Sequence, residues 1–417
     1  MRVQRCKGTR DLSPDEMTKF RLIEGIFRDC CLKGGYREIR TPTLEYLHLF
    51  TSTGTLTPGT LGKVYSFLDW DGWSGERVVL RPDATIPVAR SYIDTVQDGG
   101  LTKLFYVTNI FIFEETGKET RERWQCGAEL IGAGSTTADV ELITLALDIL
   151  KKLGFRKVEL QLSHAGLIRA LLAEFGLTSQ EQASVFDQIL DGDEAVFNRL
   201  KAKTPEVGEA LAPLLDPKGQ SAGFLRNLKA LFRRDLPEFE PALDNFIDIV
   251  DLMEAMDYSY QIDIGSGRGF EYYTGIIFQL SAGRQRVAAG GRYDALIPLM
   301  GGQEVPASGF ALYLDPLMGL VKPETLDGQL PEKVLIRAGD STPETIREGF
   351  RIAAYLRETG YGAEMDLGTQ PTEDVRWILD VKNEAPRFVV TDTTTKKEFK
   401  ARTAKEVLAL LGGNGDS

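Results

Sequence analysis

The feature that most constrains this fold is a pair of segments rich in tyrosine and glycine, at 268–275 and 288–294. They read Arg-Gly-Phe-Glu-Tyr-Tyr-Thr-Gly and Ala-Ala-Gly-Gly-Arg-Tyr-Asp. Aromatic side chains favour strands, and glycine lets a backbone approach another group closely. The segments therefore predict strands on either side of a short turn that together build a small, specific pocket. For either segment in isolation, ordinary strand aromatics and an ordinary glycine turn are the alternative interpretations.

Length, composition and charge limit the classes of protein that this chain can be. Its 417 residues are too many for one ordinary core, so we expect two or three domains. No apolar run reaches the roughly 18 residues of a membrane helix, and the N-terminus does not resemble a secretory signal, so we expect a cytoplasmic protein without membrane contact. A net charge of −12 leaves no overall basic footprint, and we expect no nucleic-acid partner.

Cysteine and histidine are too few and too scattered for common metal or nucleophilic centres. The four cysteines have neither metal-ligand nor redox spacing, and His48 and His164 lie far apart in the sequence. Nothing beside either histidine resembles a nucleophile elbow. We therefore expect no metal and no cofactor, and a structural role for His164 as a core or capping residue.

Prolines and glycines at the boundaries of regular segments predict the domain organisation. We expect a core at 1–321 with a helical region at about 164–256, a linker at 322–332, and a small α/β domain at 333–417. Within the core, Ser13, Pro14 and Glu16 form a capping signature for a helix that runs to about Leu32. The segment 36–45 reads as a strand closed by proline, and 104–113 with 124–132 as an antiparallel hairpin around a charged loop.

Several segments together resemble the class II histidyl-tRNA synthetase family over nearly the whole chain. The segments are Lys7-Gly-Thr-Arg-Asp-Leu, Gly35 to Glu45, Leu80-Arg-Pro-Asp-Ala-Thr85, Arg121 to Glu129, Arg268 to Tyr273 and Ala289 to Asp294. The resemblance implies an α+β fold, with an antiparallel sheet core flanked by helices and a self-dimer built around 35–45. It also implies that 333–417 is a degenerate anticodon-binding domain. This segment carries 13 Lys and Arg against 14 Asp and Glu, which is not the basic surface of a tRNA-docking domain.

The same resemblance implies a pocket for free histidine. The matching positions are Asp83, Thr85, Gln125, Glu129, Arg268, Tyr272, Tyr273 and Tyr293. Asp83 stands where the family usually has a glutamate and is one methylene shorter. Such a set could satisfy the polar groups of a buried amino acid.

Two departures from the family concern ATP. Ile112 stands where the family has an arginine on the α-phosphate, and Pro316 stands where it has an arginine near the adenine and γ-phosphate. Neither side chain can replace a bidentate guanidinium contact, and loss of one such donor costs about two to three orders of magnitude in rate. We therefore expect no catalysis, unless a shift in register brings Arg121 or Arg123 to the phosphates.

A synthetase paralogue with the pocket kept and the ATP contacts replaced is similar to the ATP phosphoribosyltransferase regulatory subunits. That resemblance implies a non-catalytic chain that assembles with a short-form catalytic subunit in the first step of histidine biosynthesis and carries feedback by histidine. The effector could bind in the ancestral pocket or at a subunit interface, and both sites remain open. An active histidyl-tRNA synthetase and an amino-acid-binding adaptor for another partner are the alternatives.

Overall fold

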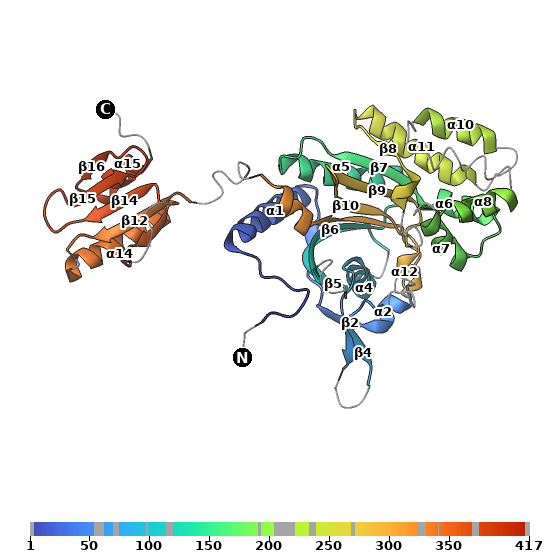
Figure 1. Cartoon of the computed structure of the whole chain (residues 1–417), viewed down its shortest axis with the longest axis horizontal. Coiled ribbons are helices and arrows are strands. Elements are labelled where there is room, and N and C mark those ends of the chain that lie inside the picture. The colour runs from blue at the N-terminus through green and yellow to red at the C-terminus, as the bar shows by residue number, and fades with distance from the viewer. Residues whose placement is uncertain are drawn as a thin grey trace. The chain divides into compact units, whose positions relative to one another are not determined.

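The structure, a computed structural model, consists of two compact units. The described residues are 4–53, 62–69, 75–96, 99–113, 120–190, 193–203, 222–232, 239–267, 272–322, 325, 331–340, 342–368 and 375–412. The units are Met1–Val321 and Lys322–Ser417 (Figure 1). Among the described residues, no helix is both long and apolar enough to cross a membrane.

An eight-stranded sheet forms the centre of the first unit. Its strands, in spatial order, are β1 (Arg37–Glu38), β5 (Thr102–Phe111), β6 (Glu122–Ile131), β11 (Ala307–Tyr313), β10 (Gln285–Arg292), β9 (Ile276–Ala282), β7 (Glu159–His164) and β8 (Gln261–Ile262). The pairs β1–β5 and β7–β8 at the two edges are parallel, and all pairs between them are antiparallel. This sheet with its flanking helices confirms the predicted α+β class.

Helices cover both faces of this sheet (Figure 1). On one face lie α1 (Pro14–Lys33), α5 (Thr136–Lys152) and α13 (Leu314–Leu320). On the other lie α4 (Thr85–Thr95) and α12 (Leu296–Leu299). The predicted capping box of α1 is confirmed, because Ser13 Oγ accepts the Glu16 amide at 3.2 Å and Glu16 Oε2 accepts the Ser13 amide at 2.8 Å.

Helices make up most of what the structure describes between β7 and β8. They are α6 (Ala165–Glu174), α7 (Ser179–Leu190), α8 (Glu194–Lys203), α10 (Ala222–Phe232) and α11 (Glu240–Ala255). A short 3-10 helix, η2 (Ile264–Gly267), follows β8. The helices α6 and α11 pack against each other, and α11 also packs against α5, so this helical region is anchored to the core.

The second unit is a small α/β fold with its own apolar core. Its sheet has the order β13 (Gly362–Met365), β12 (Lys333–Ala338), β14 (Trp377–Val381), β15 (Phe388–Asp392) and β16 (Glu398–Ala401). The helices α14 (Pro343–Glu358) and α15 (Ala404–Leu411) contribute Ile352, Leu356 and Val407 to that core.

The strand predicted over 36–45, closed by proline, is only partly present. The segment divides into β1 of the large sheet and β2 (Leu44–Tyr46) of a separate three-stranded sheet with β4 (Arg77–Leu80) and β3 (Ser66–Leu68). A short helix, α2 (Leu47–Thr51), follows β2. The buried Arg81 guanidinium donates to the carbonyls of Thr41 and Pro42 at 3.0 and 2.9 Å and holds the crossing segment. Proline has no amide hydrogen, so it does not extend a strand ladder here.

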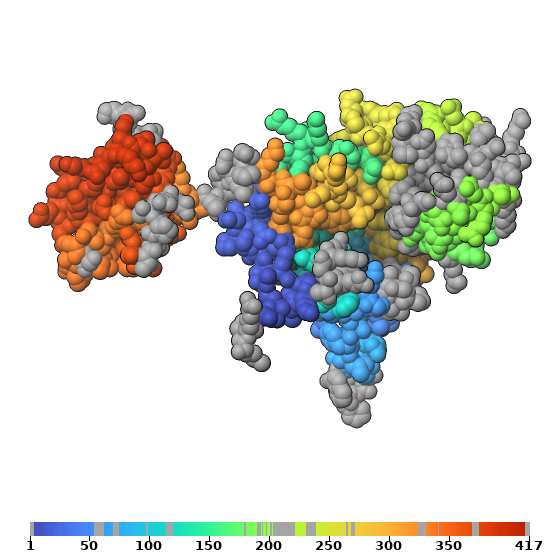
Figure 2. All heavy atoms as spheres, viewed as in Figure 1, coloured from blue at the N-terminus to red at the C-terminus, as the bar shows by residue number. Residues whose placement is uncertain are grey.

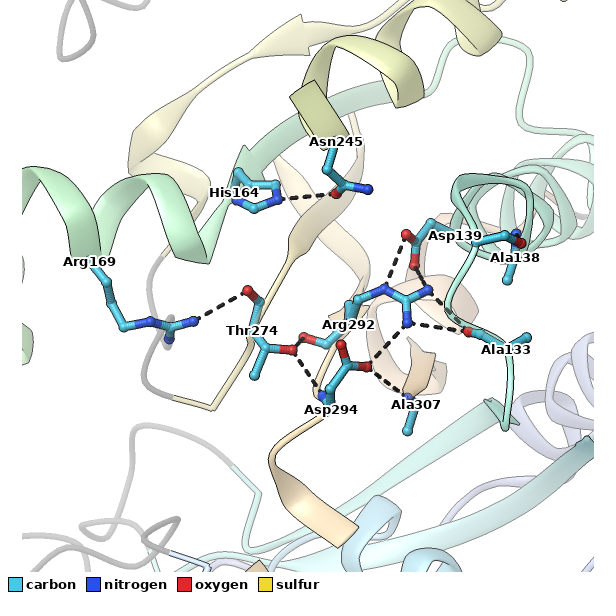
Figure 3. A network of polar contacts seen from close by, with 11 residues as sticks. Ala133, Ala138, Asp139, His164, Arg169, Asn245, Thr274, Arg292, Asp294 and Ala307 are labelled. Carbon is cyan, nitrogen blue, oxygen red and sulfur yellow. Dashed lines mark hydrogen bonds and ion pairs between the residues drawn. The ribbon is translucent and has the colours of Figure 1, made fainter. Parts of the chain in front are cut away.

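His164 caps α6, which confirms its predicted structural role (Figure 3). Its Nδ1 accepts the Leu167 amide at 3.3 Å, and its Nε2 lies 3.2 Å from Oδ1 of Asn245 on α11. Because Nδ1 is an acceptor, the ring is neutral with its proton on Nε2. Burial lowers the pKa of His164 to about 4.

We predict that His164 makes stability fall as the solution is acidified. In the unfolded chain the imidazole binds a proton near its ordinary pKa, whereas the folded chain resists protonation down to about pH 4. The free energy of unfolding should therefore decrease as the pH falls from 6.5 to 4. In His164→Asn, which keeps a capping acceptor, denaturant titrations at several pH values should show a smaller decrease. Parallel curves for the two proteins would contradict this assignment.

Candidate functional site

A buried carboxylate, Glu129 on β6, is the centre of the site. Its side chain accepts hydrogen bonds from three hydroxyl groups, which come from α4, from β5 and from the residue that follows β10. Thr85 Oγ1 and the Tyr106 hydroxyl donate to Oε1 at 2.8 and 3.1 Å, and the Tyr293 hydroxyl donates to Oε2. The residue is 1% exposed. The sheet and the first turn of α4 thus converge on one ionisable group.

Glycines in the sheet make room for the side chains of the site. Gly309 lies directly opposite Glu129, and a Cβ at Gly309 would overlap the Glu129 carboxylate. In the same way a Cβ at Gly127 would overlap the Tyr106 ring, which lies across from it. A Cβ at Gly291 would lie 2.8 Å from Cδ1 of Tyr273. Opposed residues project from the same face of an antiparallel sheet, so these glycines form a floor beneath the carboxylate and the rings.

Asp83 lies in the turn between β4 and α4. Its Oδ1 accepts the Ile86 amide at 2.8 Å, a capping contact in the first turn of α4 that the sequence analysis did not foresee. Burial raises the pKa of Asp83, and the backbone hydrogen bonds of the turn oppose this rise. The charge of Asp83 also raises the pKa values of Tyr272 and Glu129, after the larger effect of burial, so Asp83 faces the same cluster.

Three tyrosines stand together beside the carboxylates. Tyr272 and Tyr273 lie in the turn before β9 and not on the strand that their segment predicted, because β9 starts only at Ile276. The ring of Tyr272 lies 5.1 Å from that of Tyr273 and 5.5 Å from that of Tyr293, centroid to centroid. The Tyr272 hydroxyl is a buried oxygen without a hydrogen-bond partner among the described residues.

Of the remaining predicted pocket residues, the structure describes Gln125 but not Arg268. Gln125 is buried on β6 and projects from the same face as Glu129, four positions along the strand. Arg268 lies outside the described residues. The sequence analysis missed Tyr106 and Gly309 as members of the site; the position of Tyr106 across the hairpin from Gly127 was the available signal.

The site contains two carboxyl groups, and their hydrogen-bond partners are neutral. The donors that the structure describes for Glu129 and Asp83 are hydroxyl and backbone amide groups. Burial and the charge of Asp83 raise the pKa of Glu129 to about 8, against the opposing hydrogen bonds of Tyr293 and Thr85. Two neighbouring carboxyl groups, one buried and one half-buried, favour a proton or another cation between them. The arrangement can therefore hold an ammonium group or a protonated ring.

Arg292, the last residue of β10, projects from the face of the sheet opposite to Gly291, and Figure 3 shows its polar contacts. Its guanidinium forms a buried ion pair with Asp139 of α5, at 2.7 Å, and also donates to the Ala133 carbonyl and to Asp294. Asp294 in turn accepts the Ala307 amide at 2.8 Å. Arg292 thereby joins β10, α5 and β11 directly before Tyr293, a role that the Gly-Gly-Arg-Tyr segment did not reveal.

The structure describes both Ile112 and Pro316, the positions at which we expect an ATP contact to be lost. Ile112 directly follows β5, and its amide donates to the Arg121 carbonyl at 2.9 Å. Pro316 lies in the first turn of α13, next to Asp315, which pairs with Arg10. The guanidinium of Arg121 stacks on the Phe113 ring, 4.3 Å from its centroid, and Arg123 Nε lies 3.4 Å from the Thr120 carbonyl.

Comparisons with known proteins place these features in a family. The family model described as histidyl-tRNA synthetase matches residues 8–317. A curated protein of Dehalococcoides mccartyi, named ATP phosphoribosyltransferase regulatory subunit, is 50% identical over 416 residues and covers 100% of both chains. The histidine–tRNA ligase of Methanococcus maripaludis is 33% identical over 377 residues, which cover 87% of this chain and 86% of the ligase.

Solved structures share the fold. A crystal structure from Bacillus halodurans, described as an ATP phosphoribosyltransferase regulatory subunit/histidyl-tRNA synthetase, is similar with a TM-score of 0.75 and 24% identity, covering 90% of this chain and 95% of that one. A histidyl-tRNA synthetase from Nostoc is similar with a TM-score of 0.77 and 16% identity, covering 98% and 100%. The resemblance drawn from the sequence segments is thus confirmed. The chain belongs to the histidyl-tRNA synthetase family and, within it, to the ATP phosphoribosyltransferase regulatory subunits.

Proposed function

We propose that this chain is the non-catalytic regulatory subunit of ATP phosphoribosyltransferase and that its pocket around Glu129 binds free histidine as an effector. The observation that carries the proposal is a buried carboxylate with neutral hydrogen-bond donors, in a chain that has Ile112 and Pro316 at the expected ATP positions. The chain keeps a site for a small cation, whereas uncharged side chains replace the arginines that would bind a triphosphate.

The pocket supplies groups that match free histidine. Glu129 and Asp83 would accept hydrogen bonds from its ammonium group, with Thr85 holding Glu129 in place. The ring cluster of Tyr272, Tyr273 and Tyr293 would surround the imidazole, and the unpartnered Tyr272 hydroxyl could pair with a ring nitrogen. Gln125 and Arg268 are proposed as the contacts on the carboxylate side, on the strength of the family resemblance.

The proposed catalytic partner is the short-form ATP phosphoribosyltransferase subunit. The name of the Dehalococcoides relatives, 49–50% identical over their full length, supports a catalytic partner of this activity. Because adenylation requires positive charge around the phosphates, a chain with Ile112 and Pro316 would contribute regulation and not chemistry. We further propose that the protein acts in the cytoplasm.

Two other functions remain as competitors. The 33% identity to an archaeal histidine–tRNA ligase supports an active synthetase, in which Arg121 or Arg123 would take over the phosphate contacts. An amino-acid-binding adaptor for an unrelated partner would also use the pocket. Phosphoribosyl transfer distinguishes both from the proposed function.

A self-dimer is also proposed, through the face of the three-stranded sheet that bears Leu44, Tyr46 and Phe67. These apolar side chains are 48%, 44% and 44% exposed, and Tyr46 and Phe67 both lie opposite Val78 on β4. Apolar groups gathered on one exposed face are typical of an interface.

We predict that this chain activates a short-form catalytic subunit and does not activate histidine itself. Phosphoribosyl transfer by the catalytic subunit should rise when this chain is added, and histidine should inhibit the mixture. Pyrophosphate exchange with histidine and ATP should stay at the level of a protein-free blank, since the two lost donors cost about two to three orders of magnitude each. An archaeal histidine–tRNA ligase serves as the positive control. Robust exchange would establish the synthetase, and equal transfer rates with and without this chain would exclude partner activation.

We predict that histidine binding expels a proton from Glu129. The pKa of its carboxyl is raised to about 8, so at pH 7 the ligand-free group is mostly protonated, and an ammonium ligand requires the ionised form. Affinity should therefore fall with decreasing pH below 8, by up to about tenfold per unit for one linked proton. Calorimetry at pH 7 in buffers of different ionisation enthalpy measures the protons released.

Two isosteric variants on β6 make this measurement specific. Glu129→Gln should abolish the release and weaken histidine binding by about 10- to 100-fold, as expected for a lost charge-assisted hydrogen bond. Glu122→Gln carries the same change on the opposite face of the strand and should behave as the unmodified protein. Unchanged affinity and proton release in Glu129→Gln would remove Glu129 from the effector site.

We predict that Tyr46→Glu dissociates the self-dimer. A buried, unpaired carboxylate at an apolar interface is unfavourable, so the sedimentation mass should fall from twice the 46.2 kDa chain mass toward a single chain. Leu101→Glu, at another exposed apolar residue outside this sheet, is the matched control and should remain dimeric. A dimer that persists in Tyr46→Glu would place the interface elsewhere.

A further inference from the structure

The turn that carries Tyr272 and Tyr273 is held between two parts of the first unit. On the sheet side, the Thr274 amide donates to the Arg292 carbonyl at 2.6 Å, and Thr274 Oγ1 accepts the Asp294 amide at 2.9 Å. On the helical side, the Ala165 amide at the start of α6 donates to the Gly275 carbonyl at 2.8 Å. Movement of the turn relative to either part would therefore break hydrogen bonds.

Arg169 of α6 also contacts this turn, and its bond to Thr274 is drawn in Figure 3. Its Nη1 donates to the Tyr273 carbonyl at 2.7 Å, and its Nη2 donates to the Thr274 carbonyl at 3.3 Å. A guanidinium is a planar, rigid fork, so two donors on successive carbonyls restrict the rotation of the peptide between them. The ring of the same tyrosine, Tyr273, packs against Gly291.

The opposite connections of α6 reach the rest of the helical region. His164 caps the helix and pairs with Asn245 of α11, and α6 packs on both α7 and α11. The charges of Arg169 and Arg292 both contribute, after burial, to the low pKa of His164, which is consistent with their closeness to the cap. The turn that carries Tyr272 and Tyr273, the His164 cap and α6 are therefore connected by hydrogen bonds.

We propose that Arg169 is a positioning residue that couples occupancy of the tyrosine pocket to the helical region α6–α11. A ligand that pairs with the Tyr272 hydroxyl restrains the turn, and Arg169 passes that restraint to α6 through the two carbonyls. The coupling changes how easily α6 opens and needs no large displacement. This coupling rests on the proposed histidine site, whereas the positioning of the turn by Arg169 does not.

Hydrogen exchange of the full-length chain, read by mass spectrometry, tests both statements. Without ligand, Arg169→Gln should exchange faster than the unmodified protein in peptides that cover 272–282 and 165–174. With saturating histidine, the unmodified protein should be protected in both segments. In Arg169→Gln, at a histidine concentration that calorimetry shows to be saturating, 272–282 should still be protected while 165–174 should not. Arg169→Lys, which can donate to one carbonyl, should restore part of the α6 response.

A matched control and three outcomes decide the result. Arg226→Gln removes a surface ion pair with Asp251 in the same helical region and should respond to histidine as the unmodified protein does. Unchanged exchange of the ligand-free Arg169→Gln would overturn the positioning role. An equal α6 response to histidine in Arg169→Gln and the unmodified protein would overturn the coupling. Faster exchange in ligand-free Arg169→Gln, combined with no histidine binding by the unmodified protein, would uphold the positioning role and overturn the histidine site together with its coupling.

Discussion

The rest of the site depends on the burial of one carboxylate, Glu129, inside a sheet. Transfer of an ionised carboxyl out of water is costly unless hydrogen bonds or a counter-charge compensate it. Here three hydroxyl groups provide hydrogen bonds, and the pKa of Glu129 still rises to about 8. The group therefore favours a cation, and a ligand ammonium can supply what the protein does not. Gly309 allows this arrangement, since any side chain there would occupy the space of the carboxylate.

The same fold supports two different functions, and local charge separates them. Structures described as histidyl-tRNA synthetases resemble this chain over nearly its whole length, so the fold alone does not specify catalysis. Binding of an amino acid requires a small buried polar site, whereas its adenylation also requires guanidinium groups around a triphosphate. We propose that Ile112 and Pro316 alter only the second requirement. Feedback by histidine would then use an amino-acid pocket in which binding is not followed by chemistry.

Local sequence signals predicted those elements in which neighbouring residues decide the structure. Ser13, Pro14 and Glu16 lie within one turn and predicted the start of α1, and two strand patterns on either side of a charged loop predicted the β5–β6 hairpin. The strand expected over 36–45 is divided between two sheets, and Arg81, distant in sequence, binds the carbonyls of the segment that crosses between them. Tyr106 was missed as a site residue because its contact with Glu129 depends on the pairing of two strands, which periodicity does not reveal.

The sequence by itself determined the fold class and the family, since these follow from segment patterns and residue types. Only the tertiary structure decided which side chains meet: that Glu129 receives three hydroxyl groups, that Asp83 also caps α4, and that Arg169 binds the Tyr273 carbonyl. The physical reason is distance. Hydrogen bonds and pKa shifts act over a few ångströms, between groups that lie far apart along the chain and that strand register and helix packing alone bring together.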